Sequence, residues 1–233
     1  MEYIQNFAFF WVGEDVEIPT YLVKSINNTY SNNVNIFMLT DKKTAFIHGV
    51  TKSIRSLLPK DIMLARLKAY SQLKNNEQVI FLDADSLVTS KIKKISTIKK
   101  LALFRRKKQG MVINCNYPEY YPEFVNKTFD EMMPFLFGLI VTEDINSSKN
   151  FTCILNVAKK LPPRFHRWYG DQFALKIAAD SKQINFQEFN FDDYVATIRD
   201  ESDLTELSKP IVTFKGKRSK PLIKLIYNKI FDN

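Results

Sequence analysis

Short apolar runs alternate with segments of helical periodicity along the first part of the chain. The apolar runs at residues 7–12, 34–39 and 79–82 are typical of strands. Between them, residues 19–30 and 61–73 repeat apolar side chains every three or four positions, which predicts helices. Because strands alternate with helices, the pattern indicates a mostly parallel, Rossmann-like central sheet flanked by helices. We therefore predict an α/β fold.

The pattern continues beyond residue 110. It predicts further strands at residues 111–115 and 135–141 and helices at 151–158 and 173–179. The first of these helices stops before Pro162 and Pro163, because proline cannot continue a helix. With no internal repeat, low-complexity tract or linker, we expect a single domain over residues 1–233.

Three segments are polar or ambiguous. Residues 91–108 are dense in lysine and are interpreted as a solvated surface, while residues 117–122, rich in tyrosine and proline, predict a loop over the sheet edge. Residues 222–231 carry one apolar stripe of Leu222, Ile223, Ile226 and Ile230 between lysines. That stripe, part of a basic C-terminal segment at 215–233, either docks on the domain or rests on an anionic membrane, and docking is favoured.

Composition limits the classes of partner and compartment. The 233 residues carry a formal net charge of +9, which implies attraction to an anionic partner. Only Cys115 and Cys153 are present, and an unpatterned pair favours reduced thiols. No run approaches the roughly 18 apolar residues that span a bilayer. We expect a cytoplasmic protein, with a peripheral contact at the inner membrane surface as an option for the basic C-terminus.

The apolar run at 79–82 ends abruptly in Asp83-Ala84-Asp85, the only Asp-x-Asp in the chain. Open α/β sheets bind ligands at the carboxyl ends of their strands. Two ionised carboxylates about 4 Å apart repel by roughly 4 kcal/mol at an effective dielectric of about 20, so the protein must supply a cation or protonate one of them. A divalent cation is the usual remedy. The pair therefore predicts a Mn²⁺ or Mg²⁺ site. The alternative is that both residues are turn and cap residues after a strand.

Two further residues stand out, one within a predicted helix and one just before another. Arg66 shares the inward face of the helix at 61–73, and a buried arginine requires an anionic partner. That partner is either a substrate phosphate or a core carboxylate such as Asp83. Asp171 precedes the helix at 173–179, where it can act as an N-cap, as a pocket residue or as both.

Four motifs occur in one order along most of the chain: Leu64-Ala65-Arg66-Leu67, Leu82-Asp83-Ala84-Asp85, Gly170-Asp171-Gln172 and the segment from Phe214 to Pro221. Together they resemble the motifs of GT-A glycosyltransferases, in particular the group of glycogenin and the bacterial lipooligosaccharide galactosyltransferases. The resemblance implies the GT-A fold and a nucleotide-diphospho-sugar donor, most often a UDP-sugar. It also implies a Mn²⁺ or Mg²⁺ cofactor and a glycan, glycolipid or glycoprotein acceptor.

The same resemblance implies roles for individual residues. Asp85 would bind the metal, and Asp83 would contact both metal and ribose, with Ala84 between them. Lys220 and the backbone at Gly216 would face the phosphates, and Asp171 and Gln172 would lie beside the anomeric carbon and the acceptor. The remaining residues expected around the donor are Phe10, Trp11 and Val12 at the uracil, and Asp41 and Arg66 in the same crevice.

The chain departs from the family pattern at two places. Thr213 stands where the family supplies a histidine to the metal, and a hydroxyl is a weaker ligand than imidazole. The ion would then rely on two carboxylates, phosphate and water. Because the family is mostly retaining, the resemblance implies a retaining hexosyl- or pentosyltransferase. The family's Asn-Ala-Gly element is replaced near Leu136-Phe137-Gly138, which weakens the expectation of retention. An inverting reaction would need a general base such as Asp171.

Three other functions are compatible with parts of the sequence. The chain could bind sugar nucleotides without turnover, because Thr213 replaces the histidine. A haloacid-dehalogenase-like phosphatase also places Asp-x-Asp after a strand, but on its first strand and followed by Gly-Thr, whereas Ser86-Leu87 follows here. A nucleic-acid-binding module is disfavoured, since the lysines do not form a basic stripe interleaved with aromatic residues.

Overall fold

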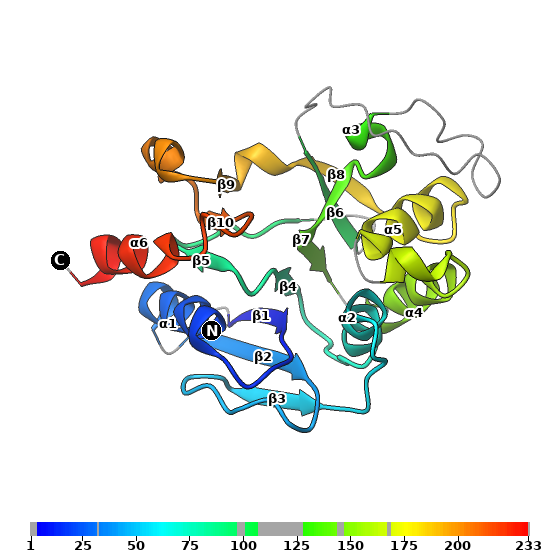
Figure 1. Cartoon of the computed structure of the whole chain (residues 1–233), viewed down its shortest axis with the longest axis horizontal. Helices are drawn as coiled ribbons and strands as arrows, with labels where there is room; N and C mark the ends of the chain where they lie inside the picture. Colours follow the sequence, from blue (N-terminus) through cyan, green and yellow to red (C-terminus); the bar gives the residue numbers. More distant parts are fainter. Residues whose placement is uncertain are drawn as a thin grey trace.

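The computed structural model describes residues 4–31, 33–96, 101–106, 128–143, 147–166 and 169–232. They form a seven-stranded sheet with helices on both faces and a smaller three-stranded sheet beside it (Figure 1). The large sheet has the order β3-β2-β1-β4-β7-β6-β8. Its strands are β1 Gln5–Phe10, β2 Val34–Thr40, β3 Lys52–Arg55, β4 Val79–Leu82, β6 Leu101–Arg105, β7 Phe135–Thr142 and β8 Gln187–Asn190.

Only β7 runs against the other strands of the large sheet. It pairs antiparallel with β4 and β6, whereas β1 pairs parallel with β2 and β4, and β6 pairs parallel with β8. The prediction of a mostly parallel α/β sheet is therefore confirmed.

Strand β4 shows how the sequence builds the layers. All four of its residues are buried, and alternate side chains point to opposite faces of the sheet. Val79 and Phe81 pack in the core under the helices α2 (Ile62–Tyr70), α4 (Ser147–Ala158) and α5 (Gly170–Asp180). Ile80 and Leu82 pack in the opposite core under α1 (Glu17–Tyr30). A strand buried on both faces must be apolar throughout, which explains the uninterrupted run.

The smaller sheet has the order β5-β10-β9, with β5 Ser86–Val88, β9 Val195–Ile198 and β10 Ile211–Phe214. The C-terminal helix α6 (Leu222–Phe231) buries Leu222, Ile223 and Ile226 against it. Helix α6 also contacts α1, where Asn28 Nδ2 donates a hydrogen bond of 2.9 Å to the Tyr227 hydroxyl. Most of the predicted apolar stripe is thus covered by the protein itself.

Short helical segments complete the described fold: α3 Phe129–Met132, η2 Pro163–His166, η3 Phe191–Asp193 and η4 Glu201–Glu206. Within the described ranges, no helix combines the length and the apolar character needed to cross a membrane.

The interpretation of residues 91–108 as a solvated surface is wrong for its central part. Residues 101–105 form β6, and Leu101, Ala102, Leu103 and Phe104 are at most 1% exposed. The apolar run is only four residues long, with two lysines before it and two arginines after it, so the segment is dominated by charged residues. The predicted strand at 111–115 and the loop at 117–122 lie outside the described residues.

Candidate functional site

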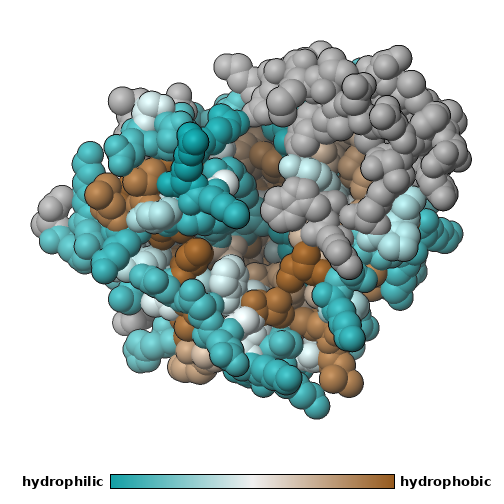
Figure 2. All heavy atoms as spheres, in the orientation of Figure 1, coloured by the Kyte–Doolittle hydropathy of each residue, from teal (hydrophilic) through white to brown (hydrophobic). Residues whose placement is uncertain are grey.

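A cavity of about 1370 Å³ lies at the carboxyl ends of β1 and β4, between the two sheets. The surface is hollowed there (Figure 2). All but one of the residues predicted for the site line this cavity: Phe10, Trp11, Val12, Arg66, Asp83, Ala84, Asp85, Asp171, Gln172, Gly216 and Lys220. Residues from separate parts of the sequence therefore converge as the strand-end rule predicts.

Asp83 is positioned by the antiparallel neighbour of its strand. Its backbone N–H donates a hydrogen bond of 3.2 Å to the carbonyl of Gly138 on β7. A Cβ atom added at Gly138 would lie 2.6 Å from Asp83 Oδ2, which is too close for any side chain. Glycine at this position thus makes room for the Asp83 carboxylate.

Asp85 is positioned by the smaller sheet. Its backbone carbonyl accepts a hydrogen bond of 2.9 Å from Phe214 N–H, at the end of β10. The chain then turns through Gly216, whose φ of 93° favours glycine, and continues to Lys220. This turn brings two lysines over the acidic pair.

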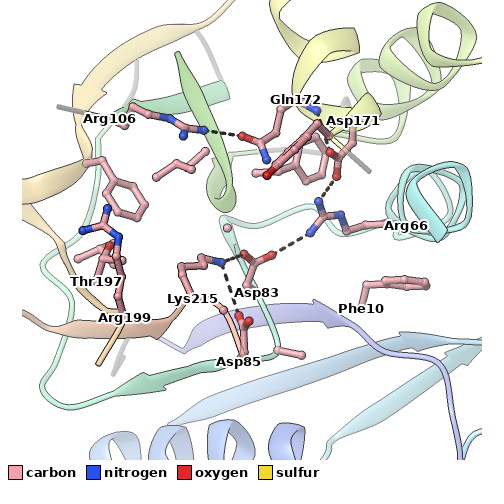
Figure 3. Close-up of a pocket in the computed structure, with 18 of the residues that line it drawn as sticks. Phe10, Arg66, Asp83, Asp85, Arg106, Asp171, Gln172, Thr197, Arg199 and Lys215 are labelled. Carbon is pink, nitrogen blue, oxygen red and sulfur yellow. Dashed lines mark hydrogen bonds and ion pairs between the residues drawn. The ribbon is translucent and has the colours of Figure 1, made fainter. Parts of the chain in front are cut away.

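Arg66 joins two carboxylates from distant parts of the chain (Figure 3). Its Nη1 lies 2.8 Å from Asp83 Oδ1, and its Nη2 donates to Asp171 Oδ2. The guanidinium also lies over the ring of Phe137, 4.7 Å from its centroid. The anionic partners of Arg66 are therefore core carboxylates, one of the two alternatives that the sequence left open.

Two lysines complete the cluster on the other side of the acidic pair. Lys215 Nζ contacts Asp83 Oδ2 and lies 3.6 Å from Asp85 Oδ1 (Figure 3). Lys220 Nζ contacts Asp85 Oδ2 and donates to the carbonyl of Phe214 at 3.2 Å. Burial alone would raise the pKa of Asp83, but Lys215 and Arg66 hold that pKa at about 2. Asp83 is thus a carboxylate at neutral pH.

Asp171 is placed by the tight start of α5. A Cβ atom added at Gly170 would lie 1.9 Å from the carbonyl oxygen of Phe165, so only glycine fits there. The Asp171 side chain is fully buried, and its Oδ1 accepts a hydrogen bond of 2.8 Å from Gln172 N–H. Its other oxygen binds Arg66. Both oxygens of Asp171 are therefore engaged.

Arg106 follows β6 and reaches the same cavity. Its Nη2 donates a hydrogen bond of 2.6 Å to Gln172 Oε1 (Figure 3). Burial lowers the pKa of Arg106 to about 10, against the attraction of Asp130 and Tyr169. Arg106 is not among the predicted site residues, because it lies in the segment interpreted as a solvated surface.

Phe10, Trp11 and Val12 line the cavity at the end of β1, but Asp41 does not. Asp41 Oδ1 accepts hydrogen bonds from Lys43 N–H at 3.0 Å and from both the N–H and the hydroxyl of Thr44, at 2.8 and 2.7 Å. These bonds lower the pKa of Asp41. Its carboxylate closes a turn after β2 instead of facing the crevice.

Thr213 lies on β10 opposite Thr197 of β9, and Thr197 lines the cavity whereas Thr213 does not. The Thr213 hydroxyl is buried and, in the described part of the chain, has no hydrogen-bond partner. The described residues contain no group of three or more His, Cys, Asp and Glu side chains arranged to hold a metal ion.

Comparison of the whole chain with solved structures identifies the fold. The galactosyltransferase LgtC, solved in complex with donor and acceptor sugar analogues, aligns over 97% of this chain and 96% of its own, with a TM-score of 0.59 and 11% identity. The chain has the GT-A fold. The prediction drawn from the four motifs is confirmed at this level.

Two further glycosyltransferases share this fold. The bifunctional WbbM aligns over 94% of this chain at a TM-score of 0.59 and 13% identity, and GlyE of Streptococcus pneumoniae TIGR4 over 99% at 0.56 and 14%. The chain spans 47% of the WbbM chain and 64% of the GlyE chain. No protein-family model and no curated protein matches the sequence.

Proposed function

We propose that the protein is a glycosyltransferase that moves a sugar from a nucleoside diphosphate donor, a UDP-sugar, to a glycan, glycolipid or glycoprotein acceptor. The observation that carries the proposal is the convergence of Asp83, Asp85, Lys215 and Lys220 at the strand ends of a GT-A fold. A volume of about 1370 Å³ exceeds the roughly 300–1,000 Å³ of a typical small-molecule pocket. It can hold a donor together with the end of an acceptor.

Each part of the donor has a counterpart in the cavity. Phe10, Trp11 and Val12 offer an aromatic and apolar wall to the base. Lys215 and Lys220 supply positive charge where the departing diphosphate gains negative charge, which stabilises the transition state. Asp171 and Gln172 line the same cavity, where the sequence resemblance implies that they lie beside the sugar.

We further propose a retaining reaction. Asp171 is the candidate general base for an inverting reaction, yet it is fully buried and both of its oxygens are bonded, to Arg66 and to Gln172 N–H. Pairing with arginine lowers the basicity of a carboxylate. This favours a reaction in which an oxygen of the departing diphosphate takes the proton of the acceptor hydroxyl.

A Mn²⁺ or Mg²⁺ ion on Asp83 and Asp85, which the sequence resemblance implies, would be one means of offsetting the diphosphate charge when bound. The lysines of the same cavity are another. Both are compatible with transfer from a nucleoside diphosphate sugar, so the proposed reaction does not depend on the choice between them.

The proposal is tested by incubating the protein with a panel of nucleoside diphosphate sugars, with Mn²⁺ and with EDTA, and measuring release of the nucleoside diphosphate. We expect release from a UDP-sugar, reduced in Asp85→Asn because the carboxylate that holds Lys215 and Lys220 is neutralised, and kept in Asp180→Asn, a control at the exposed end of α5. Tight UDP binding without any release would indicate a binding protein without turnover. Absence of both binding and release would refute the proposal.

A further inference from the structure

The space between Asp83 and Asp85 is already taken by a cation from the chain itself. Lys215 Nζ contacts Asp83 Oδ2 and lies 3.6 Å from Asp85 Oδ1, so the ammonium bridges the two carboxylates (Figure 3). An ammonium group has no lone pair with which to bind a metal ion. Its positive charge also repels a divalent ion at the same place.

Every oxygen of the acidic pair faces a basic group. Asp83 Oδ1 lies 2.8 Å from Arg66 Nη1, and Asp83 Oδ2 contacts Lys215. Asp85 Oδ1 faces Lys215, and Asp85 Oδ2 contacts Lys220. Together with Asp171, the pair makes three carboxylates, and their charges are balanced by Arg66, Lys215 and Lys220. The repulsion between the two carboxylates, which predicted a metal from the sequence, is therefore offset by arginine and lysine side chains.

Thr213, where the resembled family supplies a histidine to the metal, is also a poor source of a third metal ligand. Thr213 lies on β10, two residues before Lys215, but it is buried and does not line the cavity. The Thr213 hydroxyl and Asp85 Oδ1 both lack a hydrogen-bond partner in the described residues, which is the one feature that favours a metal. A hydroxyl and one carboxylate oxygen form a poor site for a divalent ion when an ammonium lies beside them.

We propose that Lys215, supported by Lys220, takes the place of the divalent cation, so that the protein binds its nucleoside diphosphate donor and acts on it without a metal. Both ammonium groups are accessible from the cavity, since the Lys215 side chain is 36% exposed and that of Lys220 is 33% exposed. This inference rests on the proposed function for the identity of the ligand.

The chemical step balances without a metal. The bond between the anomeric carbon and the diphosphate oxygen breaks, and its electron pair stays on the diphosphate. A bond forms between the anomeric carbon and the acceptor oxygen, whose proton passes to the departing diphosphate. The two lysines stabilise the charge that accumulates on that leaving group while remaining protonated themselves.

The test uses UDP as the probe and isothermal titration calorimetry in EDTA and in Mn²⁺. We expect the wild-type protein to bind UDP with the same Kd in both, and Lys215→Met to bind about 10- to 100-fold more weakly in EDTA, because one charge-assisted contact is lost. Mn²⁺ should restore UDP binding to Lys215→Met, since the carboxylate pair is then open. Lys224→Met, on the exposed face of α6, is the matched control and should bind as wild type.

A second measurement separates this inference from the proposed function. Mn²⁺ alone, followed by the EPR signal of the free ion, should bind to Lys215→Met and not to the wild-type protein, whether or not UDP binds. The lysine assignment would be overturned if the wild-type protein bound UDP only with Mn²⁺, or if it bound Mn²⁺ alone. Neither result would contradict the proposed transferase function. Failure of UDP to bind in every condition would instead count against the proposed donor.

Discussion

Replacing Arg66 by methionine should destabilise the fold strongly, because Arg66 is the cation that faces the fully buried Asp171. Asp83 keeps Lys215 in the variant, but Asp171 keeps only a hydrogen bond from Gln172 N–H. Breaking a buried ion pair by removing one partner costs roughly 3–5 kcal/mol. For a protein of this length that corresponds to a Tm lower by roughly 6–20 °C.

The assay is urea unfolding of the wild type, Arg66→Met, Asp171→Asn and the double variant, followed by circular dichroism. Neutralising Asp171 in the double variant should recover part of the loss, with a coupling free energy of about 2–3 kcal/mol. A loss below about 1 kcal/mol in Arg66→Met would refute the reasoning, since exposed pairs contribute that little. A coupling free energy near zero would likewise show that the two side chains do not depend on each other.

Three further predictions concern the site and its support. Gly138→Ala should lower the free energy of unfolding by about 1–3 kcal/mol and reduce turnover, because the added Cβ would displace the Asp83 carboxylate. Chemical denaturation measures the loss of stability, and kcat/KM measures the loss of turnover. Lys220→Met should weaken UDP binding by about 10- to 100-fold, measured by calorimetry, with an unchanged Kd contradicting a phosphate contact. Ile226→Ala should cost about 2–5 kcal/mol of unfolding free energy, because that side chain of α6 is fully buried against the smaller sheet.

The parts of the fold with strong local signals were predictable. The run at 79–82 is apolar because β4 is buried on both faces, and the acidic pair follows it because the strand ends at the cavity. The inward placement of Arg66 also follows from helical spacing, and the structure supplies the expected anionic partners. These residues were predictable because their signals lie within the sequence of a single helix or strand.

Contacts that depend on long-range pairing were not predictable. Strand β6 is recognisable only once β7 and β8 flank its four apolar residues, and Arg106 could not be placed before β6 was known. Lys215 lies in a recognised motif, but its side chain meets Asp83 only because β10 pairs with β5. Asp41 does not line the cavity for a local reason, since Thr44 binds its carboxylate in a turn.

The position of a bound donor tests the account most directly. A crystal structure of the protein with UDP should place the diphosphate against Lys215 and Lys220 at the ends of β4 and β10, with the base beside Phe10 and Trp11. A nucleotide bound elsewhere, or a diphosphate directed away from Asp83 and Asp85, would contradict it.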